Sequence, residues 1–173
     1  MIVTHTKVSA IGDGGDSNLI RPSDWNASHT LSNVFRGALV HINAPQVISN
    51  ITLTAVNWDL EVYDTDSIHE SITYPSRLTV PAGVTFVKLV GNIYWADNST
   101  GFRYFVIYKN GDLFNGSPIL RCPATGTSEG NICSPVVAVT GGNYFTLVVY
   151  QSSGGNLNVV NYQGTWFAME IIQ

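Results

Sequence analysis

Short apolar runs separated by glycine- and proline-rich turns follow one another from Phe35 to the end of the chain. The segment "VNWDLEVYD" alternates, with Val56, Trp58, Leu60 and Val62 on one side and polar residues between them. A period of two residues places successive side chains on opposite faces of a β-strand. The pattern therefore predicts a half-buried strand whose apolar face carries these four residues.

The remaining apolar runs predict further strands and the turns between them. "YPSRLTVPAGVTFVKLVGNIYW" predicts two strands broken at Pro81–Gly83, and "TWFAMEII" predicts a closing strand. In "FRYFVIYKNGDLF", the pair Asn110-Gly111 favours the positive φ angles of a type I′ hairpin turn. Three more strands follow, punctuated by two Gly-Gly turns. Short, regularly spaced strands without a helical stretch predict an all-β sandwich or barrel.

Two of these strands are apolar on both faces. In the strand over residues 102–108, Phe105 and Ile107 oppose a face that carries Tyr104 and Tyr108. Residues 144–151 repeat this arrangement, with Phe145, Leu147 and Val149 opposite Tyr144 and Tyr150. One face must enter the core, and the tyrosine-rich face suits a wet or polar partner. We expect subunit packing to cover it, and the alternative is a cover of loops.

Composition strengthens the expectation of covered surface. Only 12% of the 173 residues are charged, about half the roughly 25% usual in soluble domains. The net charge of −4, without any Lys/Arg cluster, gives no reason to expect a nucleic-acid partner. No apolar run is long enough to span a bilayer and no signal peptide is evident, so we expect neither membrane insertion nor Sec export. The sequence predicts no cofactor and no metal site.

Several motifs together carry a resemblance to a known family. In order along the chain they are "TVPAGVTFVKL" (Thr79–Leu89), "YKNG" (Tyr108–Gly111), "GGNYFTLVVYQSSG" (Gly141–Gly154) and "GTWFAMEI" (Gly164–Ile171). Their order and spacing over residues 34–173 resemble the complement-type globular head of the tumour-necrosis-factor-like superfamily. Asn143 stands in place of the aspartate of that family's "GD" turn, and Thr85 in place of an aromatic residue.

This resemblance implies a ten-strand jelly roll, a homotrimer about a three-fold axis, and binding rather than catalysis. A trimer would use the tyrosine-rich faces, so we expect its interface to contain Tyr104, Tyr108, Tyr144, Tyr150 and Trp166.

The first 33 residues predict an irregular N-terminal arm. "HTKVSAIGDGGDSNLIRPSDWNASHTL" (His5–Leu31) is similar to N-terminal segments of tailed-bacteriophage virion proteins, of the form "HxKvxxxxDGxDxxLxRPsDWNxxH". The resemblance implies a virion-docking arm that uses Asp13, Asp16, Arg21, Pro22, Asp24, Trp25 and Asn26. Trp25 is a large anchor in a segment with almost no other core-forming residues, and tryptophan and arginine dominate interface energetics. The alternative is that Trp25 packs back onto its own sandwich.

We therefore expect a non-enzymatic phage structural protein on the virion surface, assembled in the bacterial cytoplasm. Without a coiled-coil or β-helical shaft in the chain, a homotrimeric capsid decoration or short head fibre fits better than a long tail fibre. The alternative is a receptor-binding fibre tip whose loops, with Asp97, Asn98, Asn115 and Ser128, recognise a bacterial surface glycan.

A further alternative is a small glycan depolymerase that uses Asp59 and Glu61, since paired carboxylates hydrolyse glycosidic bonds. Two questions stay open at this point. Asp64 and Asp66 carry oxygen ligands of the kind that calcium binds, and Cys122 and Cys133 flank a loop that a disulfide would close.

Overall fold

The structure, a computed structural model, describes residues 2–3, 12, 14–15, 29–30, 35–124, 128–161 and 164–172. In these ranges the chain forms strands and turns and no helix. The described residues therefore include no helix that is long and apolar enough to cross a membrane. The chain divides into two compact units, Met1–Phe35 and Arg36–Gln173.

In the first unit, β1 (Ile2–Val3) pairs antiparallel with β2 (His29–Thr30). The predicted docking residues, Asp13, Asp16, Arg21, Pro22, Asp24, Trp25 and Asn26, lie outside the described residues. The boundary expected after residue 33 also falls among residues that the structure does not describe.

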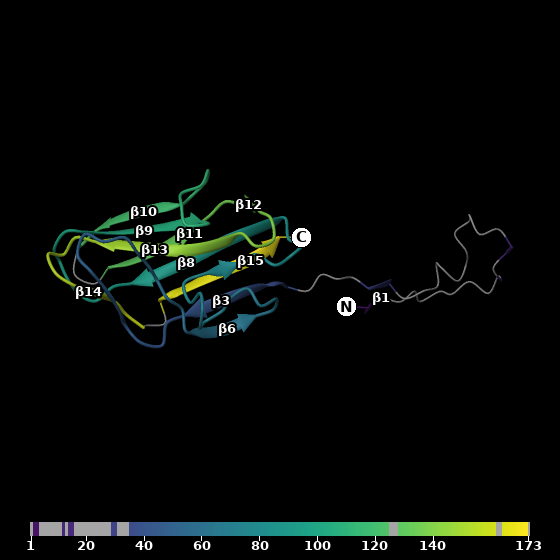
Figure 1. Ribbon diagram of the computed structural model, residues 1–173, viewed down its shortest axis with the longest axis horizontal. Coiled ribbons are helices and arrows are strands. Elements are labelled where there is room, and N and C mark those ends of the chain that lie inside the picture. The colour runs from purple at the N-terminus through teal and green to yellow at the C-terminus, as the bar shows by residue number, and fades with distance from the viewer. Residues whose placement is uncertain are drawn as a thin grey trace. The chain divides into compact units, whose positions relative to one another are not determined.

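The second unit, the head, consists mainly of two antiparallel sheets, each named here after a central strand (Figure 1). The β15 sheet has the order β11-β8-β15-β3-β6, and β12 also pairs with β8. Its strands are β3 (Gly37–His41), β6 (Leu60–Asp64), β8 (Phe86–Tyr94), β11 (Glu129–Cys133), β12 (Val137–Ala138) and β15 (Trp166–Ile172).

The β13 sheet has the order β10-β9-β13-β5, with β7 also paired to β13. Its strands are β5 (Thr54–Ala55), β7 (Leu78–Thr79), β9 (Phe102–Lys109), β10 (Ile119–Pro123) and β13 (Tyr144–Gln151). A separate pair joins β4 (Gln46–Ile48) to β14 (Leu157–Val159). Because the chain passes repeatedly from one sheet to the other, the architecture is the all-β jelly roll that the sequence predicted.

The core lies between the inner faces of the two sheets. Phe105 and Ile107 of β9 and Phe145, Leu147 and Val149 of β13 are fully buried in it, as predicted from their alternation. Trp58 stacks on Phe167 with ring centroids 5.9 Å apart, so aromatic rings fill much of the space between the sheets. At Gly91, an added Cβ would lie 2.8 Å from the Leu147 side chain, so a larger residue there would require that side chain to shift.

The predicted hairpin turn is confirmed by its backbone angles. Asn110 has φ 53° and Gly111 has φ 89°, the two positive values that a type I′ turn requires. The turn joins β9 to the loop that leads to β10 and lies beside Tyr144, whose backbone N–H donates to the Asn110 side chain at 2.9 Å.

The sandwich has two distinct ends. The head begins at Arg36 beside the C-terminal residues of β15, since Ile171 donates its backbone N–H to the Arg36 carbonyl at 3.0 Å. We call this the Arg36 end. The opposite end, the Asn98 end, carries the loop over residues 96–101 and strand β14, whose Asn158 carbonyl accepts from the Ala96 N–H at 2.9 Å. Figure 1 shows β14 and the C-terminus at opposite ends of the head.

Candidate functional site

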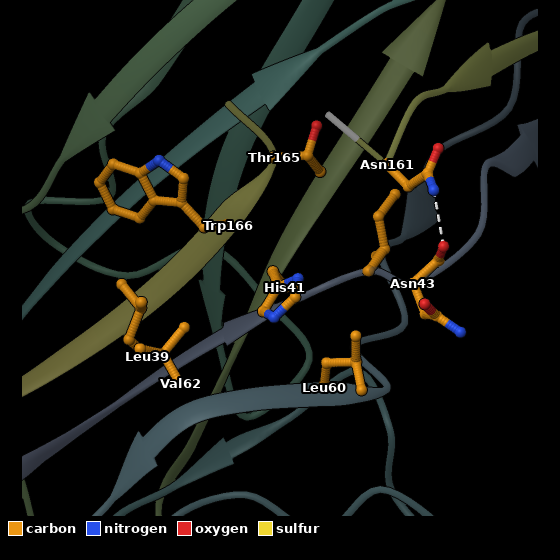
Figure 2. Close-up of a pocket in the computed structure, with 9 residues that line it drawn as sticks. Leu39, His41, Asn43, Leu60, Val62, Asn161, Thr165 and Trp166 are labelled. Atoms are coloured by element: carbon orange, nitrogen blue, oxygen red, sulfur yellow. Dashed lines mark hydrogen bonds between the residues drawn. The ribbon is translucent and has the colours of Figure 1, made fainter. Parts of the chain in front are cut away.

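An aliphatic surface covers part of the outward face of the β15 sheet. We call it the aliphatic face, and it consists of Leu39, Leu60, Val62 and Trp166 from three neighbouring strands. Leu60 is 38% exposed and Val62 is 62% exposed. Figure 2 shows these side chains around one pocket of about 520 Å³. Exposed branched side chains gathered on a sheet face mark a surface suited to a partner.

The exposure of Leu60 and Val62 corrects the sequence prediction. Val56 and Trp58 are fully buried, as expected, but the other two residues of the alternating run point outward. The chain leaves the β13 sheet after β5 and joins the β15 sheet at β6, and β6 pairs with β3 through a register shift at Leu39/Val40. Since the run crosses between sheets, a single alternation no longer describes one face.

Polar groups fix the mouth of this pocket. Asn161 donates its side-chain amide to the Asn43 carbonyl at 2.6 Å, the contact drawn in Figure 2. Asn43 in turn donates its backbone N–H to the Asp59 carboxylate at 2.6 Å. Thr165 donates its hydroxyl to the Val160 carbonyl at 2.7 Å. These rim groups are therefore engaged in holding loops together, and the floor available for contact is the aliphatic face together with His41.

The outward face of the β13 sheet is aromatic. It carries Tyr104, Tyr108, Tyr144 and Tyr150, all half-buried, together with Phe102. The residues predicted for a trimer interface are therefore divided between two sheets, because Trp166 lies on the β15 sheet. The structure brings the four tyrosines together and does not bring Trp166 to them.

Two arginines lie over rings of this aromatic face, one toward each end. Arg77 lies 3.9 Å from the ring centroid of Tyr144 and 4.3 Å from that of Tyr74. Arg121 lies 3.8 Å from the ring centroid of Phe102. Phe102 also stacks on Tyr150 with centroids 5.4 Å apart.

A groove of about 340 Å³ lies at the Arg121 side of this face. Leu53, Phe102, Tyr104, Arg121 and Tyr150 line it, and we call it the aromatic groove. Burial, and to a smaller extent the neighbouring Tyr108, raises the pKa of the Tyr104 hydroxyl. Tyr104 therefore stays neutral around pH 7 and is able to donate a hydrogen bond.

The predicted ligand-loop residues occupy different places. Asp97 is exposed and Asn98 half-buried at the Asn98 end, where Asn98 accepts the Thr100 N–H through its side chain at 2.8 Å. Ser128 is at the same end, but it is only 5% exposed. Asn115 is exposed on the loop between β9 and β10, toward the Arg36 end. The four residues do not form one site.

Sequence reasoning missed the buried Arg103. Its guanidinium donates to the carbonyls of Asn98 at 2.8 Å and Thr100 at 3.1 Å, so it holds the loop over residues 96–101 against the core. Burial lowers the pKa of Arg103. A signal existed, because Arg103 has the same parity in β9 as the core residues Phe105 and Ile107.

The acidic residues singled out in the sequence all have partners within the head. The Asp59 carboxylate accepts from Asn43, and Glu61 contacts the His69 ring nitrogen at 2.8 Å. The two carboxylates therefore make structural contacts in separate places.

The carboxylates considered for calcium are likewise engaged. Asp64 accepts backbone N–H groups from Ile68 at 2.9 Å and His69 at 2.8 Å. Asp66 forms an ion pair with Arg36, and that guanidinium holds the pKa of Asp66 below its usual value. In the described part of the chain, no three acidic, histidine or cysteine side chains gather as a metal site would require.

The two cysteines are free thiols. Cys122 lies in β10 of the β13 sheet and Cys133 in β11 of the β15 sheet, so they belong to different layers of the sandwich. Burial raises the pKa of the Cys122 thiol.

No family model and no curated protein matches the sequence. Solved structures do match in fold. Murine APRIL at pH 5.0 is 14% identical with a TM-score of 0.58, over 80% of this chain and 100% of its own. The Eiger TNF of S. frugiperda is 14% identical with a TM-score of 0.53, over 80% of this chain and 93% of its own. These likenesses define the fold as a tumour-necrosis-factor-like jelly roll, as the sequence motifs implied.

Proposed function

We propose that the protein is a non-enzymatic structural component of a bacteriophage virion, a homotrimeric capsid decoration or short head fibre whose N-terminal arm docks on the particle. The observation that carries the oligomeric part is the aliphatic face. Leu60 and Val62 stand exposed on an antiparallel sheet and line one pocket with Trp166, where a soluble monomer would carry polar residues. Packing against neighbouring copies would remove this surface from water.

The virion part of the proposal rests on the arm. Its "DGGD" and "RPSDWN" segments are similar to those of tailed-phage virion proteins, and a large tryptophan beside an arginine suits an anchor that docks on a second protein. Under this proposal the head projects from the particle surface and the arm provides the attachment.

The experiment combines light scattering with capsid binding. Size-exclusion chromatography with light scattering should give three copies of the 18.8-kDa chain. Full-length protein should then co-sediment with purified capsids that lack it. The variant Trp25→Ala should remain trimeric and lose capsid binding.

Each outcome bears on one part of the proposal. A monomeric wild-type protein would contradict the trimer. A trimer that ignores capsids would contradict virion docking through the arm, and if it adsorbed to host cells it would support the receptor-binding alternative instead.

A further inference from the structure

We infer that the aromatic groove on the outward face of the β13 sheet is a binding site for an acidic carbohydrate, with Arg121 as the residue that recognises the sugar's carboxylate. This inference goes beyond the proposed function, and it concerns a different sheet from the aliphatic face that carries the proposed trimer.

Because Arg121 lies over the Phe102 ring, the rings of Tyr104 and Tyr150 provide the surface on which a sugar ring would pack. Phe102 and Tyr150 stack 5.4 Å apart with 24° between their planes, and Tyr104 and Leu53 complete the lining. The C–H groups on one face of a pyranose are apolar and pack on aromatic faces, while its hydroxyls need donors and acceptors at the edge. The Tyr104 and Tyr150 hydroxyls supply such groups.

Arg121 supplies the charge. Its guanidinium lies over the Phe102 ring, with the central carbon 3.8 Å from the ring centroid. A guanidinium that stacks on a ring keeps its N–H donors free for a ligand. The side chain is exposed, and in the described ranges no carboxylate lies within ion-pair distance of it. A pre-positioned guanidinium without an acidic partner suits bidentate contact with a ligand carboxylate.

The direction of the groove favours a carbohydrate over a peptide. Its lining residues come from Leu53 beside β5 and from β13, β9 and β10 in turn, so the groove runs across the strands. In β13 and β9 the backbone groups are already paired within the sheet. An extended peptide there would find no backbone partners, whereas recognition through side-chain faces suits a sugar.

The test uses the full chain and a defined pair of probes. One is an oligosaccharide of alternating glucuronic acid and N-acetylglucosamine, and the other is the same oligosaccharide with its carboxylates reduced to primary alcohols. We expect calorimetry to show at least about tenfold tighter binding of the acidic probe, since a charge-assisted bidentate contact contributes that much. Arg121→Gln should abolish the difference between the two probes.

Arg77→Gln is the matched control. Arg77 also lies over aromatic rings of the same sheet, but it does not line the groove. Its substitution removes the same charge and should leave binding of both probes unchanged. Equal losses in Arg77→Gln and Arg121→Gln would point to unspecific charge attraction and would overturn the site.

Three further results would overturn the inference. These are no binding of either oligosaccharide, equal binding of both by the wild-type protein, and Arg121-dependent binding of a polyglutamate peptide without binding of the sugar. The last would indicate an acidic protein partner. Light scattering on the same samples tests the oligomeric state independently of sugar binding. A monomer that binds the acidic sugar would contradict the proposed trimer but would still support this site.

Discussion

The two outward faces of the head both carry few charged residues, but they differ in the kind of apolar side chain that they expose. On the β15 sheet, Leu60, Val62 and Trp166 form an apolar floor, and the polar groups of Asn161 and Thr165 at its rim are engaged with backbone carbonyls. On the β13 sheet, tyrosine hydroxyls and the arginines over aromatic rings keep polar groups within a similarly apolar surface. A face rich in tyrosine and arginine can bind water and polar ligands through its hydroxyl and guanidinium groups. A contact made through a face rich in leucine and valine is stabilised chiefly by the removal of apolar surface from water. The first kind therefore suits ligand binding, and the second suits permanent contact between subunits.

The largest effect expected from this difference between the two faces is dissociation of the proposed trimer. Val62→Asp should convert the trimer into monomers, because it places three unpaired carboxylates in a surface that the proposed assembly removes from water. Light scattering gives the mass directly. The control Leu53→Asp introduces the same charge at a residue of similar exposure, 51% against 62%, on the other sheet. If both variants dissociated, or if neither did, the assignment of the aliphatic face to subunit contact would be wrong.

A smaller effect, on stability, is expected at the inner face of the β13 sheet. Arg103→Ala should lower the free energy of unfolding by about 3 kcal/mol, because it opens a cavity in the core and leaves the carbonyls of Asn98 and Thr100 without this donor. Urea unfolding at fixed protein concentration measures this. Arg103→Lys keeps the charge but cannot reach both loop carbonyls with one planar fork. Its free energy of unfolding should therefore lie between those of the wild type and Arg103→Ala. A loss below about 1 kcal/mol for the alanine variant would show that the loop holds without Arg103.

A still smaller effect is expected where an arginine lies over rings at the surface. Arg77→Gln should reduce the free energy of unfolding by about 0.5–1 kcal/mol, the usual contribution of an exposed cation–π contact. The same urea titration measures it, with Arg77→Lys as the conservative variant. A loss several times larger would mean that Arg77 supports the sheet by more than its ring contacts.

The smallest effect is a change in the acid stability of the fold, caused by an ion pair beside the β15 sheet. Arg36, and next the hydroxyl of Thr65, hold the pKa of Asp66 below 3.8. Since the folded-state pKa is the lower one, the ionised carboxylate stabilises the fold above about pH 4, and this contribution is lost as the pH falls through the folded-state pKa. Asp66→Asn should therefore show a smaller drop in melting temperature than the wild type between about pH 5 and about pH 3. Equal drops would mean that the pair adds nothing, as for many exposed ion pairs.

Much of the fold follows from local pattern. The hairpin at Asn110-Gly111 and the core faces of β9 and β13 were predictable because strand alternation and turn chemistry act within a few residues. The outward positions of Leu60 and Val62 were not, because the alternating run continues while the chain passes from one sheet to the other. The alternation of apolar and polar residues does not show where the chain passes from one sheet to the other.

The candidate sites were predictable only in part. The tyrosine-rich faces could be found from each strand separately, but the contact of Arg121 with Phe102 depends on how β10 is registered against β9. Cross-strand neighbours of this kind are set by pairing over long sequence separations. For the same reason the sequence could not show that Trp166 and the four tyrosines belong to different sheets.

The position of β3 has a mechanical consequence. This strand starts next to Arg36 and is hydrogen-bonded on both sides, to β15 through Gly37–His41 and to β6 through Ala38–His41. A pull on the chain at residue 36 along the strand axis would load both ladders in shear, so that many hydrogen bonds must fail together rather than one after another. A tether placed there would resist force far better than one that peels an edge strand from its sheet.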